Sequence, residues 1–306
     1  MKSWVRIYGG VGLAMIFWSL SFIWFKVANE TFRPVTIVFF RLVISVILLT
    51  AYLFVKKKSM SIRKEDRWLF AMLALFEPFF YFLGESFGLT YVSATVGSVL
   101  ISTIPVFATL GAWILFRERL KLINYAGIVL SFMGVLVFLL NGGTLSFDTR
   151  GLALLALAVF SAVGYNLTLG RLVGTYSPAL IVTVQNSLGA ILFLPVFMIS
   201  DFRYLTGTPV NFVSFVPIIE LSVFASCFAF ILFAYSVRNM GVTKANVFTN
   251  FIPGLTAIFS FIILGEKLSF QNILGMMIVI AGIYMAQING RRKKTDDASI
   301  LTGKTA

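Results

Sequence analysis

Two stretches of this sequence, 148 positions apart, follow one pattern. Residues 93–120 read SATVGSVLISTIPVFATLGAWILFRERL, and residues 241–268 read GVTKANVFTNFIPGLTAIFSFIILGEKL. Six residues recur in register, and the match runs past the quoted stretches: Thr95 with Thr243, Pro105 with Pro253, Glu118 with Glu266, Leu120 with Leu268, Gly127 with Gly275, and Gly134 with Gly282. Two apolar stretches can resemble each other through composition alone, but a shared register of prolines, glutamates and glycines favours an internal repeat.

The composition identifies the kind of protein in which this repeat occurs. The chain has 306 residues, of which 59% are hydrophobic and only 12% are charged, and its mean hydropathy is +0.94. A soluble domain carries about 25% charged residues, so this chain has too little polar surface to cover a soluble fold. We therefore expect an all-α polytopic membrane protein, because a helix satisfies its own backbone hydrogen bonds in lipid.

A bilayer core about 30 Å thick requires roughly 20 apolar residues per helix. Ten segments of this kind are predicted as membrane spans: Ile7–Ala28, Val35–Val55, Trp68–Leu89, Ser93–Phe116, Leu122–Leu140, Gly151–Gly170, Pro178–Ile199, Phe212–Val237, Thr243–Leu264 and Phe270–Ile288. No connection between them is long enough to form a soluble domain.

The basic residues predict the orientation of these spans. With ten spans, 19 of the 25 Lys and Arg residues fall on the side of the two termini, four fall on the other side and two lie inside spans. Because cytoplasmic loops carry the excess of Lys and Arg, both termini are expected in the cytoplasm, with the protein in a plasma membrane such as the bacterial inner membrane. The net charge of +13 is thus assigned to membrane topology and not to nucleic-acid binding.

The repeat also predicts the domain organisation. One repeat covers residues 5–140 and the other covers residues 150–289, with a polar cytoplasmic tail at 290–306. Because each repeat contains an odd number of helices, five, the second enters the membrane upside down. Inverted repeats are typical of secondary transporters, which hold substrate near the midplane between the halves.

Missing residue types exclude several chemistries. The chain has no histidine and a single cysteine, Cys227, which argues against Ser-His or Cys-His catalysis and against the usual zinc or haem sites. All five aspartates fall outside the predicted spans, so a paired-aspartate intramembrane hydrolase is not expected. We predict no catalytic residues, no metal and no cofactor.

The repeated motif is similar to that of a known family. The segment Tyr91–Thr95, Pro105, the sequence from Phe116 to Leu120, Gly127 and Gly134 resemble the EamA domain of the drug/metabolite transporter superfamily. The second copy keeps the Gly-Glu-basic-Leu pattern at 265–268, whereas Arg117 replaces the glycine in the first. The resemblance, which extends over residues 5–289, implies ten helices in two inverted halves around a central cavity with alternating access. It does not specify the substrate.

Two charged residues inside the spans have similar depths. Arg41 lies roughly 9 Å and Glu85 roughly 6 Å below the same boundary, at a rise of about 1.5 Å per residue. We expect them to form an ion pair or gate. The alternative is that both face an aqueous vestibule without touching.

Glu77 lies near the middle of the third span, where no basic residue shares its depth. An ionisable group there is expensive and is a functional candidate by default. An unpaired carboxyl at this depth is most stable as the neutral acid. Tyr81 is one turn away, so Glu77, Tyr81 and Glu85 are expected along one flank. Glu77 either binds a substrate amine or a coupling proton, or hydrogen-bonds a neighbouring helix.

Small polar pairs recur before the repeated prolines. Ser98 and Ser102 precede Pro105, and Asn246 and Asn250 occupy the matching positions before Pro253. They are predicted to face the cavity, with contact between neighbouring helices as the alternative. Trp18 in the first span and Asn166 in the sixth are further cavity candidates.

These observations favour a secondary transporter of small metabolites, expected to export amino acids or related compounds and to work as a monomer in the bilayer. Glu77 would allow coupling to protons. The alternative is a multidrug or other small-molecule exchanger or facilitator. An intramembrane enzyme lacks the residues it needs, and an inverted repeat fits a rocking carrier better than the fixed pore of a channel.

Overall fold

The computed structural model describes residues 2–58, 60–108, 110, 121–141, 144–145, 148–207 and 212–286. The predicted tail at 290–306 and the first copy of the glutamate motif, around Glu118, lie outside these residues.

The described chain is helical apart from one very short hairpin, whose strands pair Leu140 with Leu145 and Asn141 with Thr144. The elements with their bounds are α1 (Lys2–Asn29), α2 (Pro34–Val55), η1 (Lys64–Asp66), α3 (Arg67–Ala74), η2 (Leu75–Phe80), α4 (Tyr81–Tyr91), α5 (Ala94–Ile101), α7 (Leu122–Leu139), β1 (Leu140–Asn141), β2 (Thr144–Leu145), α8 (Thr149–Leu172), α9 (Pro178–Ser200), α10 (Phe202–Gly207), α11 (Phe212–Glu220), η3 (Leu221–Ala229), α12 (Phe230–Met240), α13 (Val242–Val247), η4 (Phe248–Phe251), α14 (Ile252–Phe259), η5 (Ser260–Leu264) and α15 (Phe270–Ala286).

Several of these elements join end to end into longer helices. In the described residues, eight helices are long and apolar enough to cross a membrane, and two shorter apolar helices cover Ala94–Ala108 and Phe270–Ala286. All ten coincide with the segments predicted from the sequence. The prediction of an all-α protein with ten apolar helices is therefore confirmed.

Local sequence explains where the helices begin. Pro34 and Pro178 each stand at the first position of a helix, where the missing N–H of proline costs nothing. Ser177 and Ser93 are N-caps, because their hydroxyl oxygens accept hydrogen bonds from Leu180 N (3.3 Å) and Val96 N (3.2 Å). The capping oxygen satisfies one of the backbone donors that a helix start leaves unpaired.

Glycines bring helix α7 and helix α15 into direct contact. A Cβ atom on Gly127 would lie 2.3 Å from Ala286 N, and one on Gly134 would lie 2.5 Å from Val279 N. From the other side, a Cβ on Gly282 would lie 2.3 Å from Ser131 N. The backbones can approach this closely only without side chains, which is the usual basis of tight packing between membrane helices. The seven-residue spacing of the glycines predicts this shared face.

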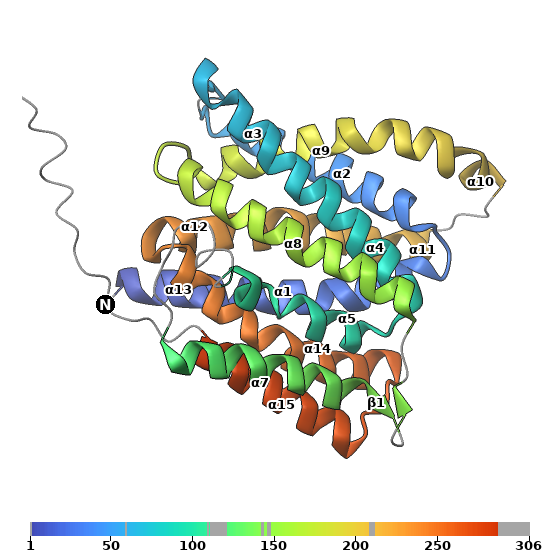
Figure 1. The fold of residues 1–306 in the computed structure, drawn as a ribbon. Helices are drawn as coiled ribbons and strands as arrows, with labels where there is room; N and C mark the ends of the chain where they lie inside the picture. The colour runs from blue at the N-terminus through green and yellow to red at the C-terminus, as the bar shows by residue number, and fades with distance from the viewer. Residues whose placement is uncertain are drawn as a thin grey trace, which may run out of the picture.

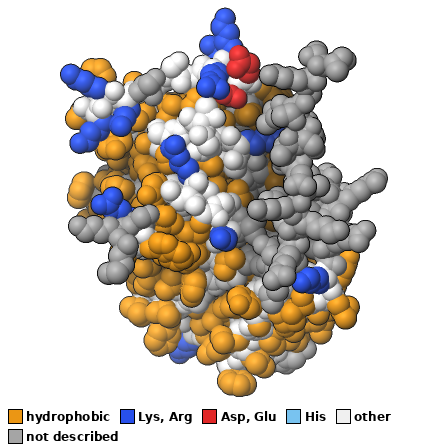
Figure 2. Space-filling model, turned by 90° about the vertical axis from the view of Figure 1, so that its left-hand side faces the viewer, with side chains coloured by type: hydrophobic (Ala, Val, Ile, Leu, Met, Phe, Trp, Pro, Cys, Tyr) orange, Lys and Arg blue, Asp and Glu red, His pale blue; other side chains and the backbone are white. Residues whose placement is uncertain are grey.

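The helices form a layered bundle (Figure 1). Helices α2, α3, α4, α8 and α9 lie in the upper part, α1 crosses the middle beside α5 and α14, and the α7–α15 pair closes the lower side. Hydrophobic side chains cover much of the surface (Figure 2). At the end of the bundle where α1 begins, which faces the viewer in Figure 2, Lys and Arg side chains are spread widely and acidic side chains are few.

Four segments inside the long helices depart from α-helical geometry. Segments η2, η3 and η5 are π-helical, and η4 is a 3-10 helix. Such segments often mark functional sites, since they change the direction of the side chains that follow them. Three of them, η2, η3 and η4, contribute to or support the cavity described next.

Candidate functional site

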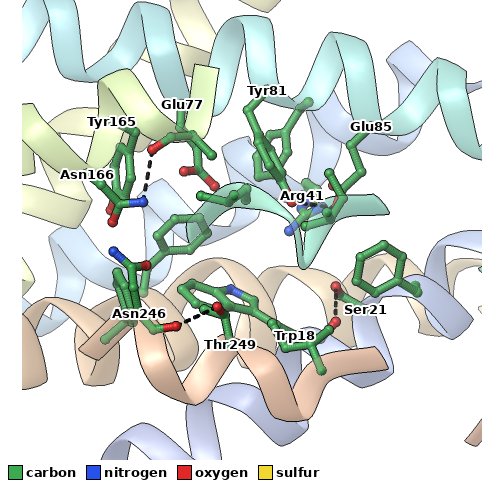
Figure 3. A pocket seen from close by; sticks show the side chains of 18 residues that line it. Trp18, Ser21, Arg41, Glu77, Tyr81, Glu85, Tyr165, Asn166, Asn246 and Thr249 are labelled. Carbon is green, nitrogen blue, oxygen red and sulfur yellow. Dashed lines mark hydrogen bonds between the residues drawn. The ribbon is translucent and has the colours of Figure 1, made fainter. Parts of the chain in front are cut away.

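A cavity lies inside the bundle and is lined by both halves of the chain (Figure 3). Helices α1, α2, α4 and α5, with η2, contribute from the first half, and α8, α12, α13, η4 and α14 contribute from the second. Its polar or amphipathic lining residues are Trp18, Ser21, Arg41, Glu77, Tyr81, Glu85, Tyr165, Asn166, Asn246 and Thr249. A polar cavity between two halves of a helical bundle is suited to holding a small molecule.

Glu77 reaches this cavity because its helix is interrupted. Its backbone leaves the helical region (φ −148°, ψ 118°) directly before Pro78, since proline supplies no N–H and disfavours helical geometry at the residue before it. The Glu77 side chain is 7% exposed. Within the described part of the chain its carboxyl group forms neither a hydrogen bond nor an ion pair. Such a group is available to a ligand or a proton.

Tyr81 and Glu85 share the flank of Glu77, as their spacing predicts, and all three line the cavity. The Tyr81 hydroxyl donates a hydrogen bond of 2.9 Å to Glu85 Oε1. This bond fixes the Glu85 carboxylate toward the cavity (Figure 3).

The predicted ion pair between Arg41 and Glu85 is not formed. Both side chains line the cavity, but among the described residues the only ion pair joins Arg150 and Asp148. Each partner is held elsewhere, because Glu85 accepts from Tyr81 while Arg41 Nε donates to Ser226 Oγ at 2.9 Å. The Arg41 guanidinium also lies over the Phe82 ring, with Cζ 4.2 Å from the centroid. The vestibule alternative, in which both groups face one space, describes the geometry better.

A buried polar network supports Arg41 from behind. Asn186 Nδ2 donates to Ser45 Oγ (3.0 Å) and to the Ser226 carbonyl (3.1 Å). These contacts connect α9, α2 and η3, and they orient the Ser226 segment that holds Arg41. A hydrogen-bonded network of this kind favours one position of the side chain that it supports.

Aromatic side chains form one wall of the cavity. The Trp18 indole meets Phe230 edge to face, with ring centroids 5.3 Å apart, and lies 5.0 Å from Phe233. Tyr165 also meets Phe230 edge to face, with ring centroids 6.1 Å apart. Such T-shaped and tilted pairs are favourable packing geometries. The predicted cavity residue Trp18 thus belongs to an apolar surface opposite the charged flank.

The asparagine pair of the second half is separated by a change in helix type. Asn246 lines the cavity, whereas Asn250 is buried outside the lining and Thr249 occupies the cavity face instead. The cause is η4, since in a 3-10 helix the residues that share a face are three apart and not four. Thr249 also donates to the Asn246 carbonyl at 2.7 Å.

The serine pair of the first half does not line the cavity either. Ser98 and Ser102 are fully buried, and their hydroxyl groups donate to the carbonyl groups of Thr95 and Val99 in their own helix. Asn166 does line the cavity and donates to the Ala162 carbonyl at 2.9 Å (Figure 3). Gln185, at the position that matches Arg41 in the second half, is fully buried and outside the lining.

Several cavity residues gave no sequence signal. Phe230, Phe233, Ile101 and Ile104 resemble every other apolar residue of a membrane helix, so only the fold identifies them. Thr249 could have been found from its position three residues after Asn246 if the 3-10 segment had been foreseen. The described residues contain no cluster of His, Cys, Asp and Glu able to bind a metal ion.

Comparison with known proteins identifies the family. The model of the EamA-like transporter family matches residues 7–140 and again residues 149–287. A transporter of Archaeoglobus fulgidus named as uncharacterized is 30% identical over 282 residues, which are 90% of this chain and 95% of that protein. The similarly named transporter YcxC of Bacillus subtilis is 26% identical over 281 residues, 90% of each chain.

A solved crystal structure shares the fold. It superposes with a TM-score of 0.67 at 14% sequence identity and covers 90% of this chain and 94% of its own. The helical bundle, the cavity between its halves and the family match over nearly the whole chain lead to one conclusion: the chain is a membrane protein of the EamA-like transporter family.

Proposed function

We propose that this protein is a secondary transporter that exports amino acids or related small metabolites by alternating access. The observation that carries the proposal is the cavity shared by both halves, in which an arginine and a glutamate face the same space. A cavity between two halves can open to either side as the halves rock, which is how secondary transporters with internal repeats work.

The polar groups fit a zwitterion. Arg41 uses Nε for Ser226, and in the described residues its two terminal nitrogens have no hydrogen-bond partner, so they can bind a carboxylate in bidentate fashion. Glu77 can accept an ammonium group, and the Asn166 and Asn246 amides add donors and acceptors. Because Glu77 has no competing partner among the residues that the structure describes, it can exchange a substrate amine for a proton, which would couple transport to a proton gradient.

The charge distribution supports the proposed orientation in a plasma membrane. The end of the bundle at which α1 begins carries widely spread Lys and Arg side chains (Figure 2), as expected for a cytoplasmic surface. Both termini are then cytoplasmic. One chain lines the cavity from both halves, so we propose that the monomer is the working unit, within two inverted repeats at 5–140 and 150–289.

One observation favours a second candidate, a multidrug exchanger or facilitator. The aromatic wall of Trp18, Phe230 and Phe233 faces the acidic flank, and aromatic faces together with a carboxylate suit apolar organic cations. An enzyme is not proposed, because the chain lacks histidine and the cavity presents no activated nucleophile.

The test is flux in proteoliposomes loaded with a panel of labelled amino acids. Wild type is compared with Glu77→Gln under an imposed pH gradient, and Glu220→Gln serves as the matched control because Glu220 lies in a span but outside the cavity lining. We expect wild type and Glu220→Gln to respond to the gradient and Glu77→Gln to lose the response by at least tenfold. A gradient response that survives Glu77→Gln would contradict proton coupling through this residue, and no flux of any amino acid would contradict the substrate class.

A further inference from the structure

A carboxylate from the second half forms hydrogen bonds with the first half near one end of the bundle. Glu266, two residues after the end of η5, accepts hydrogen bonds from the start of α5. Its Oε1 accepts from Ala94 N at 3.0 Å, and its Oε2 accepts from Thr95 N at 3.4 Å and from Thr95 Oγ1 at 2.6 Å. This contact satisfies backbone donors that a helix start leaves unpaired. The negative charge of Glu266 is also favourable at the positive end of the helix dipole.

The backbone conformation before Glu266 directs the Glu266 side chain toward α5. Gly265 adopts a left-handed conformation (φ +67°) that ends the helix, and only glycine accepts this geometry without cost. The Glu266 backbone N–H then donates to the Ser260 carbonyl at 3.2 Å. The Gly265 N–H donates to the same carbonyl, so the chain turns sharply after η5 and the Glu266 side chain reaches α5.

A lysine holds the neighbouring helix end at the same place. Lys26 Nζ donates to the carbonyl groups of Leu89 (2.5 Å) and Val92 (2.6 Å) at the end of α4. A cation is favourable there because the end of a helix is the negative pole of its dipole. Lys26 and Glu266 also attract each other electrostatically. The two charges therefore fasten the turn between α4 and α5 from both of its sides.

The turn between α4 and α5 lies close to the cavity, toward one end of the bundle. Ser21 and Phe22 line the cavity, and Lys26 follows Ser21 by five residues on α1, roughly 7.5 Å along the helix axis. Between them, the Leu89 side chain packs on Gly97, where a Cβ would lie 2.4 Å from Leu89 Cδ2 and 3.6 Å from Phe22. The end in question is the one opposite the N-terminus of α1 (Figure 1), which is the extracytoplasmic end in the proposed orientation.

We propose that Glu266 is the gate residue of the extracytoplasmic end: its contact with Thr95 holds the two halves together there and must break for the cavity to open outward. This inference rests on the proposed alternating access. A Glu266 variant should therefore shift the protein toward the outward-open state, because it removes a contact made only when this end is closed.

Cysteine labelling tests the gate without any substrate. Ser21→Cys reports access to the cavity, in a Cys227→Ser background that keeps a hydrogen-bond donor beside Ser45. A membrane-impermeant maleimide is added to right-side-out spheroplasts, and the labelling rate is measured with and without Glu266→Gln. The matched control is Glu30→Gln, which removes an exposed carboxylate that follows α1 at the same end of the bundle. Thr95→Val, which removes only the 2.6 Å hydroxyl contact, is the second variant.

We expect Glu266→Gln to raise the labelling rate at least fivefold, Thr95→Val to raise it by a smaller factor, and Glu30→Gln to stay within twofold of the parent. An unchanged rate in inserted Glu266→Gln and Thr95→Val protein would overturn the gate. So would the failure of both variants to insert, because the contact would then serve assembly. Faster labelling with no flux in the amino-acid panel would retain the gate and remove the substrate assignment.

Discussion

The contact between α7 and α15 makes a quantitative prediction for Gly127→Ala. The new Cβ would lie 2.3 Å from Ala286 N, 2.7 Å from the Gly282 carbonyl oxygen and 2.7 Å from the Met285 carbonyl carbon. All three are backbone atoms, so no side chain can turn away to make room. Restoring an ordinary contact of about 3.4 Å requires the two helices to separate by about 1 Å, which loosens the packing on both sides of the contact.

The expected cost follows from overpacking, which typically amounts to about 1–3 kcal/mol. Alanine is intrinsically better in a helix than glycine by about 1 kcal/mol, so part of the cost is offset. The matched control is Gly12→Ala in α1, where a Cβ would meet nothing within 4 Å. That control gains the helix propensity without the clash.

The assay is thermal unfolding of the purified protein in detergent, followed by intrinsic fluorescence. The net cost is about 0–2 kcal/mol, so we expect Gly127→Ala to lower the Tm by up to about 8 °C, given roughly 2–4 °C per kcal/mol in chains of comparable size. Gly12→Ala should leave the Tm unchanged or raise it slightly. Equal Tm values for the two variants would refute the reasoning, because the clash would then be absent or freely relieved.

Three further predictions concern the cavity and its rim. The exchange of Arg41 and Glu85 (Arg41→Glu with Glu85→Arg) should not recover the flux lost in the single variants, because the two groups do not bind each other directly. Recovery above half of the wild-type flux would instead support the ion pair. Asn246→Leu should lower flux at least tenfold at normal membrane levels, whereas Asn250→Leu should mainly lower the Tm; the reverse order would contradict the assigned 3-10 face. The hydrogen bond from the Arg150 backbone N–H holds the pKa of Asp148 below its ordinary value of 3.8. Since this pKa is depressed on folding, its stabilisation is complete above pH 3.8 and is lost as the pH falls below it. The Tm difference between wild type and Asp148→Ala should thus be constant from pH 7 to pH 5 and shrink below pH 3.8; a difference that already shrinks near pH 5 would contradict this.

Features that depend on local chemistry or on the bilayer could be predicted from the sequence. Ten apolar stretches predict ten helices, and Pro34 and Pro178 start helices because proline fits the first turn. Gly127 and Gly134 lie seven apart, so helical periodicity places them on one face. These arguments need only the geometry of one helix at a time.

The cavity residues with the clearest sequence signal are those that are costly in lipid. Arg41, Glu77 and Glu85 stand out because an ionisable group in a span needs a reason to be there, and all three line the cavity. Phe230 and Ile101 line it as well, but an apolar residue is equally stable against lipid and gives no signal. Which apolar face points inward is decided by helix packing, which a single sequence does not encode visibly.

An irregular helix accounts for one of the predictions that the structure corrects. The expected face shared by Asn246 and Asn250 assumes an α-helix of 3.6 residues per turn, and the 3-10 segment η4 rotates Asn250 away. Glu266 was identified only as part of a repeated motif, since its role depends on Gly265 turning the chain toward Thr95, a residue 171 positions away. Contacts over such distances in the sequence need the fold.

The central claim is that one cavity carries a small molecule between the two sides of the membrane, and counterflow tests it most directly. Proteoliposomes are preloaded with an unlabelled amino acid that the flux panel identifies, and uptake of the labelled form at low concentration is followed over time. An alternating-access carrier should accumulate the label transiently above its external concentration, and Asn246→Leu should abolish this overshoot. A monotonic rise to equilibrium in the wild-type protein would contradict the account, because a channel equilibrates the label without exchange.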